Sequence, residues 1–267
     1  MAAPDSSGYA AAVSARETEG SALLAVTVAL GLIAGACDGL SYLSLDGLFV
    51  ANQTGNTVLL GLAVARGDGF ATLEYAIAIA AFIVGLAAAA LLIERLTRSG
   101  VKRMLPAVIV AEALLIALGA LIIELAGGRL SGGPSELLAG ASLSMAMGMQ
   151  TSALQKVGSW AIRTTFVTGL LTDGTLDLVA RGFDAVGSSA RSVAIPNERP
   201  LRIVVLSFSV VLAYALGAVI AGLFFKWQGG AMLFVVAAFT MLLALLTARM
   251  KLPAPDHQPT PSAPSQP

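Results

Sequence analysis

The chain has 267 residues, of which 57% are hydrophobic and 12% are charged. A soluble domain usually carries about 25% charged residues, so a mean hydropathy of +0.83 leaves too little polar surface to cover a globule in water. The formal net charge at pH 7 is 0, which argues against a nucleic-acid partner. The composition therefore predicts an all-α integral membrane protein whose solvent is the lipid bilayer.

Both ends of the chain have the composition of disordered tails. Residues 1–20 mix small and charged residues, and residues 251–267 are rich in proline. The residues before the first apolar run are acidic as well as basic, which is not typical of a signal peptide. We expect a membrane domain over residues 21–250, flanked by two disordered cytoplasmic tails.

Six apolar runs are long enough to cross a bilayer as helices, which takes about 20 residues each. They share a high content of Ala, Leu, Val and Gly, whose small members let helices pack closely in lipid. The six expected spans lie near residues 21–41, 71–93, 104–126, 135–156, 202–226 and 229–249.

Two further apolar stretches are interrupted by polar residues. Residues 42–66 and residues 157–181 each carry Asp, Thr and Gly in their middle. Non-helical backbone at membrane depth is tolerated only where it is buried in protein or lines a wet cavity. We expect two broken or half-helix segments that are re-entrant or interfacial, with full crossing as the alternative.

The distribution of basic residues favours six spans. One cluster lies at residues 95–103 and a second at residues 156–202, and short basic links are typically cytoplasmic. Six spans place both clusters and both termini in the cytoplasm. If both broken stretches crossed the membrane, the two clusters would lie on opposite sides.

The two halves of the membrane domain, about 21–126 and 135–249, resemble each other. Gly35 and Asp38 precede Thr54-Gly55 at nearly the distance that separates Gly148 from Thr168-Gly169. A unit of three spans reverses its orientation when it is repeated, so the pattern predicts a 3+3 inverted repeat, as in many secondary transporters. The alternative is that small-residue membrane sequences resemble each other through composition alone.

The polar residues of the breaks are candidates for a solute-binding site. A helix that begins at such a break offers free N–H groups, which favour an anion, although each residue could also be an ordinary helix cap. The candidates, which we expect to line a site between the halves, are Asp38, Thr54, Gly55, Asn56, Gln150, Thr168, Gly169 and Asp173.

Glu112 lies near the middle of the third expected span. A charge at that depth costs about 2.5–3.5 kcal/mol, and such residues usually face the interior of the bundle. Glu112 is therefore a candidate proton carrier, with Gln150 as a polar partner. The alternative is a neutral acid that is hydrogen-bonded to a neighbouring helix.

The sequence contains no enzyme motif and no metal-binding pattern. It lacks a Walker loop, a nucleophile elbow and a dinucleotide fingerprint. The one histidine, His257, lies in the tail, and Cys37 is the one cysteine. We therefore expect a protein that is not an enzyme and that needs no cofactor and no metal.

Two segments resemble the signatures of the YoaK family of bacterial membrane proteins. The first runs from Gly35 and Asp38 to Thr54-Gly55-Asn56-Thr57, and the second from Gly148 to Thr168-Gly169. The chain departs from the family at Asn52-Gln53 and at Thr151-Ser152. The resemblance covers residues 21–250 and implies a multi-spanning protein of the bacterial inner membrane, but no activity.

Together these features predict a small secondary-transporter-like protein that moves an unidentified small solute and is coupled to protons through Glu112. The alternative is a membrane scaffold or partner subunit that transports nothing. Homo-oligomerisation is compatible with both.

Overall fold

The computed structural model describes residues 6–101, 104–157, 165, 167–185 and 200–250. The described residues form helices and loops, with an isolated parallel β-bridge between Leu45 and Leu130. The helices in chain order are α1 (Ser6–Ser44), α2 (Gln53–Arg66), α3 (Gly69–Arg98), α4 (Met104–Leu125), α5 (Pro134–Val157), α6 (Val167–Ala185), α7 (Leu201–Gln228), the short 3₁₀ helix η1 (Gly229–Ala231) and α8 (Met232–Arg249).

Four stretches of the described chain are long and apolar enough to cross a membrane: Ser21–Ser44, Gly69–Arg98, Met104–Leu125 and Leu201–Arg249. The last stretch contains both α7 and α8, which η1 separates. α5 is not among the four, and its sequence includes Glu, Gln, Ser and Thr. The protein is thus an all-helical membrane protein, as the composition predicts.

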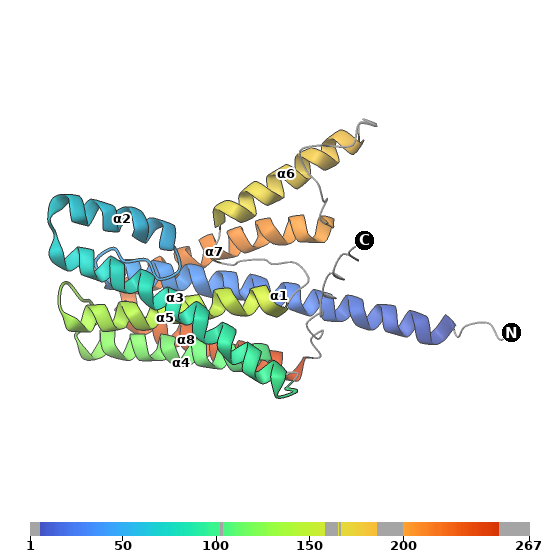
Figure 1. Ribbon diagram of the computed structural model, residues 1–267, viewed down its shortest axis with the longest axis horizontal. Coiled ribbons are helices and arrows are strands. Elements are labelled where there is room, and N and C mark those ends of the chain that lie inside the picture. The colour runs from blue at the N-terminus through green and yellow to red at the C-terminus, as the bar shows by residue number, and fades with distance from the viewer. Residues whose placement is uncertain (1–5, 102–103, 158–164, 166, 186–199, 251–267) are drawn as a thin grey trace, which may run out of the picture.

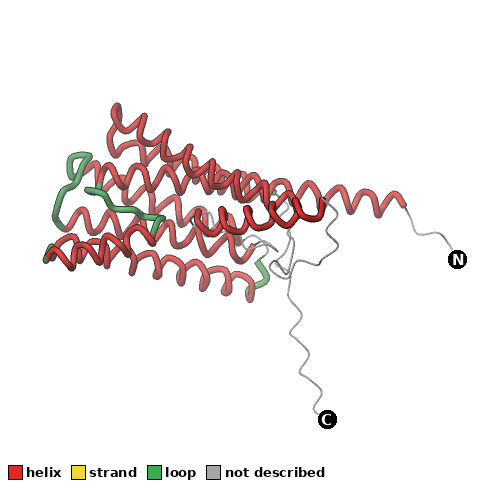
Figure 2. The backbone as a smooth tube through the Cα atoms, turned by 90° about the horizontal axis from the view of Figure 1, so that it is seen from above, coloured by secondary structure: helices red, strands yellow, loops and turns green. Residues whose placement is uncertain are grey.

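The long helices α1, α3, α4, α5, α7 and α8 lie side by side along the longest axis of the molecule (Figure 1). α2 and α6 are shorter and extend toward opposite ends of that axis. The view from above shows the same elongated bundle, with loops at its ends and one loop that runs inward from an end (Figure 2). The more polar α5 contacts α3, α4 and α1, and polar residues on it such as Ser144 and Gln150 are buried.

The N-terminal tail differs from the expectation. The backbone of residues 6–20 is helical and continues into α1, whereas the composition of residues 1–20 predicts disorder. Alanine is common in this segment and favours helix. The expectation of disorder rested on the charged residues and did not take this helix propensity into account. The expected tail at residues 251–267 lies outside the described residues.

The first broken stretch divides into a helix end, a loop and a short helix. α1 runs to Ser44, residues 45–52 form the loop, and α2 begins at Gln53. The Asn52 side chain accepts a hydrogen bond of 3.1 Å from the Gly55 N–H and so caps α2. α2 ends at Arg66 and is capped by Gly67, whose φ of 70° suits a glycine C-cap. In the second stretch α6 begins at Val167, and residues 158–164 and 166 lie outside the described part of the chain.

Glycines allow two pairs of helices to touch backbone to backbone. α1 packs on α7, and α3 packs on α5. A methyl group on Gly35 would overlap the carbonyl oxygen of Tyr214, and one on Gly217 would overlap that of Leu32. These contacts are the close approach that small residues permit between helices in lipid.

The α3·α5 crossing has the same construction. A methyl group on Gly85 would overlap the carbonyl oxygen of Met145, and one on Gly148 would overlap that of Phe82. In both crossings each glycine therefore faces the residue three positions before the partner glycine. The outer surface carries large exposed apolar side chains such as Leu125 and Trp227, as suits a surface in contact with lipid.

Candidate functional site

Asp38 holds the loop that precedes α2. Its side chain is 3% exposed, and its Oδ1 accepts hydrogen bonds from the N–H groups of Val50 at 2.7 Å and Ala51 at 2.6 Å. Its Oδ2 accepts one from the Asn52 N–H at 3.1 Å and one from the Tyr214 hydroxyl. A single carboxylate thus ties α1, the loop and α7 together.

Asn56 fastens the same loop from the other side. Its Oδ1 accepts a hydrogen bond from the Phe49 N–H at 3.2 Å, and its Nδ2 donates to the Phe49 carbonyl at 2.6 Å. Nδ2 also lies 3.1 Å from Oε1 of Gln53, and the residue is fully buried. Asn56 therefore closes the turn from α2 back onto the loop.

These bonds give Asp38 and Asn56 a structural role in binding backbone groups, which is the alternative that the sequence left open for the polar residues of the breaks. Their polar atoms are directed at backbone groups of residues 49–52. Buried polar groups are normally satisfied in this way. Their expected part in binding a solute stays a prediction. Thr54 is exposed and Gly55 is half-buried at the start of α2, so these two are the more accessible members of the set.

Gln150 lies in the interior and links α5 to α1. It is fully buried, and its Nε2 donates a hydrogen bond of 3.0 Å to the carbonyl oxygen of Leu30. At the next residue, the Thr151 hydroxyl donates to the Met147 carbonyl at 2.8 Å and lies 3.0 Å from the Thr165 hydroxyl. Gln150 is thus a polar tie between the two halves of the chain.

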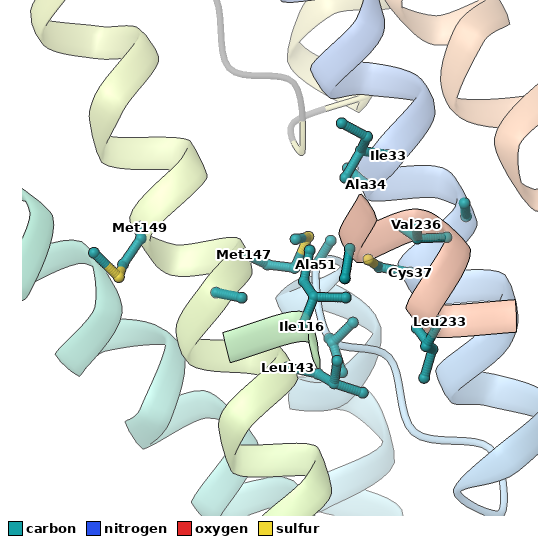
Figure 3. Close-up of a cluster of buried hydrophobic side chains, with 14 of the residues drawn as sticks. Ile33, Ala34, Cys37, Ala51, Ile116, Leu143, Met147, Met149, Leu233 and Val236 are labelled. Atoms are coloured by element: carbon teal, nitrogen blue, oxygen red, sulfur yellow. The ribbon is translucent and has the colours of Figure 1, made fainter. Parts of the chain in front are cut away.

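Glu112 lies in the centre of the bundle on α4. It is fully buried, and both carboxyl oxygens lack a hydrogen-bond partner among the described residues. It lies near Cys37 of α1, and Ile116 is four residues further along the same helix face. Figure 3 shows Cys37 and Ile116 within an apolar cluster that also includes Met147 and Val236.

A buried carboxyl group without a partner is unusual, because an unpaired charge in an apolar interior is costly. Glu112 therefore matches the expectation of an acid inside the bundle. The expected partner, Gln150, donates instead to Leu30. No group of three or more His, Cys, Asp or Glu residues among the described part of the chain is arranged to hold a metal ion.

The second-half candidates lie on α6. Thr168 is exposed, Gly169 and Asp173 are half-buried, and α6 packs mainly against α7. Leu170 on the same helix joins an apolar cluster with Ile203 and Leu206. These residues therefore belong to a different part of the molecule from the Asp38 network, and the expected single site between the halves stays a prediction.

Sequence comparison places the chain in a family. Residues 26–246 match the family described as "Protein of unknown function (DUF1275)". The chain belongs to this family. It is also 29% identical over 194 residues to the UPF0700 transmembrane protein YoaK of Bacillus subtilis (strain 168). This match covers 73% of this chain and 80% of the Bacillus protein. No solved structure matches.

The family match confirms the resemblance that the two motifs indicated. It also agrees with the apolar helices, because the Bacillus relative is named a transmembrane protein. The family carries no assigned activity.

Proposed function

We propose that this protein is a small secondary-transporter-like protein that moves an unidentified small solute and couples this movement to protons. The observation that carries the proposal is the matched construction of the α1·α7 and α3·α5 crossings. In both, a helix from one half packs on a helix from the other half through a pair of facing glycines.

The pairing is what an inverted repeat produces. If α1 to α4 correspond to α5 to α8 in order, exchange of the halves turns the α1·α7 pair into the α5·α3 pair. The same exchange turns the α2·α3 contact into α6·α7 and leaves α4·α8 unchanged, and all of these contacts are present. Gly35 then corresponds to Gly148, as the sequence repeat predicts, and Gly85 corresponds to Gly217.

Six crossings fit the course of the chain. In Figure 1, α1, α4 and α7 run in one direction along the long axis, and α3, α5 and α8 run in the other. α2 returns to the end of the molecule at which α1 finishes, as a re-entrant segment does. Arg95, Arg98 and Arg249 lie in the last turns of α3 and α8, at the end from which α1 starts. By the positive-inside rule, these basic residues favour a cytoplasmic location for this end and for both termini, in the bacterial inner membrane.

Two short helices that point their N-termini toward the middle of the bundle support a binding role. In Figure 1, the first residues of α2 and α6 lie nearer the middle than their last residues do. Helix N-termini at mid-membrane offer N–H groups to a solute in secondary transporters with inverted repeats. Thr54, Gly55, Thr168 and Gly169 occupy these two positions.

Glu112 supplies the proton-coupling group of this proposal. A carboxyl group that is buried without a partner among the described residues can lose its charge by taking up a proton. Glu112 lies on α4, a helix of the first half that contacts α5 and α8 of the second half. A proton bound there changes the charge of the interior, which is the property that a coupling residue needs.

Reconstitution into liposomes tests the proposal. The purified protein is given a panel of radiolabelled amino acids, sugars, organic anions and organic cations, with and without an inside-alkaline pH gradient. We expect one class to accumulate only with the gradient, and Glu112→Gln to abolish accumulation. Glu94→Gln, an exposed position on α3, is the matched control.

The outcome that contradicts transport is a folded protein that moves no solute of the panel under either condition. If that protein also purifies with a second polypeptide, and Glu112→Gln and Asn56→Ala weaken that complex, the alternative role as a membrane scaffold or partner subunit is supported instead.

A further inference from the structure

Two buried glutamates meet at the end of the bundle where α2 turns into α3. Glu74 lies in the second turn of α3 and is 5% exposed, and Glu136 lies in the first turn of α5 and is 1% exposed. Their carboxyl groups lie close enough to each other to interact directly, where α3 packs on α5. An ionised carboxylate is only an acceptor, so a hydrogen bond between two carboxyl groups requires a proton on one of them.

The other contacts of the two carboxyl groups leave some of their oxygens without a hydrogen-bond donor. The Gly132 N–H donates to Oε2 of Glu136. Oε1 of Glu74 and Oε1 of Glu136 are buried and have no donor among the described residues. Buried acceptors without a donor are rare in folded proteins, and one shared proton would satisfy the pair.

The groups that surround the pair are acidic or neutral. Asp46, in the loop after α1, acts on both glutamates, and Asp68, the N-cap of α3, acts on Glu74. Tyr75 on α3 is close to Glu74, and Tyr42 on α1 is close to Tyr75. No basic side chain is among the groups that act on either glutamate.

A metal ion is a weaker explanation for this arrangement. Asp46 is exposed and does not join Glu74 and Glu136 in a metal-binding group, since the described residues contain no set of three acidic, His or Cys side chains within reach of one ion. Hard cations usually require six or more oxygen ligands. A proton needs only the two carboxyl groups that are in contact.

We propose that Glu74 and Glu136 form a proton-binding site that joins the ends of α3 and α5 through one shared proton. When the proton is present, the pair carries a single negative charge and holds a hydrogen bond. When it is lost, two negative charges face each other in a site that excludes water, and they repel. The site is independent of transport and lies on other helices than Glu112.

Thermal unfolding of the full-length protein in detergent at several pH values tests the site. The folded pair retains a proton that the unfolded chain releases, so stability must fall as the pH rises. We expect the Tm of the wild type to decrease between about pH 5 and about pH 9. In Glu74→Gln the amide donates to Glu136 in place of the proton, so most of that decrease should be lost.

Glu136→Gln is the reciprocal variant, and Glu94→Gln on the exposed face of α3 is the matched control that should keep the wild-type decrease. Infrared difference spectra between low and high pH provide a readout that does not depend on unfolding. The carbonyl band of a protonated carboxylic acid should shrink in Glu74→Gln and Glu136→Gln. The band should be unchanged in Glu94→Gln.

Two results would overturn the proposal. One is a pH dependence of Tm and a carboxylic-acid band that are the same in both variants as in the wild type. The other is a wild-type Tm at high pH that EDTA lowers and Ca²⁺ or Mg²⁺ restores, with no such response in Glu74→Gln, because the ligand would then be a metal ion. If one variant does not fold, the reciprocal variant and the wild-type infrared spectrum still test whether the pair binds a proton.

Discussion

The Tyr214 hydroxyl donates a hydrogen bond to the Asp38 carboxylate, although the two residues are 176 positions apart in the chain. Asp38 lies on α1 in the first half and Tyr214 on α7 in the second. The bond is made where the backbones already touch, because the Tyr214 carbonyl faces Gly35. The glycine crossing thus brings the phenol to the acid that holds the loop before α2.

Removal of this phenol should destabilise the protein. Tyr214→Phe leaves the Asp38 carboxylate with its three backbone donors but without the hydroxyl. A hydrogen bond to a charged group contributes about 1.5–3 kcal/mol, so we expect a clear decrease in Tm in detergent. Tyr42→Phe is the control, since Tyr42 is 48% exposed. Equal Tm values for the two variants would contradict the structural role of the bond.

The glycine crossings predict that alanine is tolerated at one glycine of α7 and not at another. A methyl group at Gly217 would overlap the Leu32 carbonyl, whereas one at Gly222 has no neighbour within 4 Å. Gly217→Ala should therefore destabilise by about 1–3 kcal/mol. Gly222→Ala should leave the stability equal or raise it by up to about 1 kcal/mol.

Thermal unfolding in detergent gives the Tm of both glycine variants. Gly148→Ala on α5 should behave like Gly217→Ala, because a methyl group there would overlap the Phe82 carbonyl. If Gly148→Ala is tolerated while Gly217→Ala is not, the two crossings are not equivalent, and the argument for the repeat loses its main support.

Thiol labelling tests whether α2 is re-entrant. With Cys37 replaced by Ser, single cysteines are placed at Tyr42 in the last turn of α1 and at Asp68 after α2, both exposed. A re-entrant α2 leaves the two positions on the same side of the membrane, so an impermeant reagent should label both from outside the cell. Ser99, after α3, should label only in inverted vesicles. Labelling of positions 42 and 68 from opposite sides would mean that α2 crosses.

Replacement of Glu112 should raise stability while it removes the proposed coupling. Both oxygens of Glu112 lack a partner among the described residues, and an unsatisfied buried polar group costs about 1–3 kcal/mol. Glu112→Leu, which has a similar volume and no polar atom, should therefore increase the Tm. A decrease in Tm would indicate that the acid has a structural partner, which would weaken its candidacy as a proton carrier.

The helices could be predicted well because their signal is local. Apolar runs long enough to span gave the positions of α3, α4, α7 and α8 to within a few residues, and polar breaks indicated two short helices. The helix at residues 6–20 was not predicted, because the charged residues of this segment indicated disorder although its alanines favour helix. Where a helix ends depends on caps such as Asn52, which composition does not reveal.

The site could be predicted less well, because its contacts join distant parts of the chain. Asp38 and Asn56 were identified as polar residues in apolar surroundings, but their partners could not be inferred without knowledge of the helix packing. Glu74 and Glu136 were not singled out at all, since each lies near the start of an apolar run and resembles a helix-end residue. Only the packing of α3 on α5 brings them together.

The Asp38 network has a weaker counterpart among the described residues of the second half. When Gly35 is matched with Gly148, the counterpart of Asp38 is Thr151, whose hydroxyl meets the Thr165 hydroxyl at 3.0 Å. A neutral hydroxyl forms weaker hydrogen bonds than a carboxylate does, and Asp38 makes three with the loop backbone. Among the described residues, the Asp38 carboxylate thus anchors the loop before α2 with more and stronger hydrogen bonds than the hydroxyl pair that joins Thr151 to Thr165.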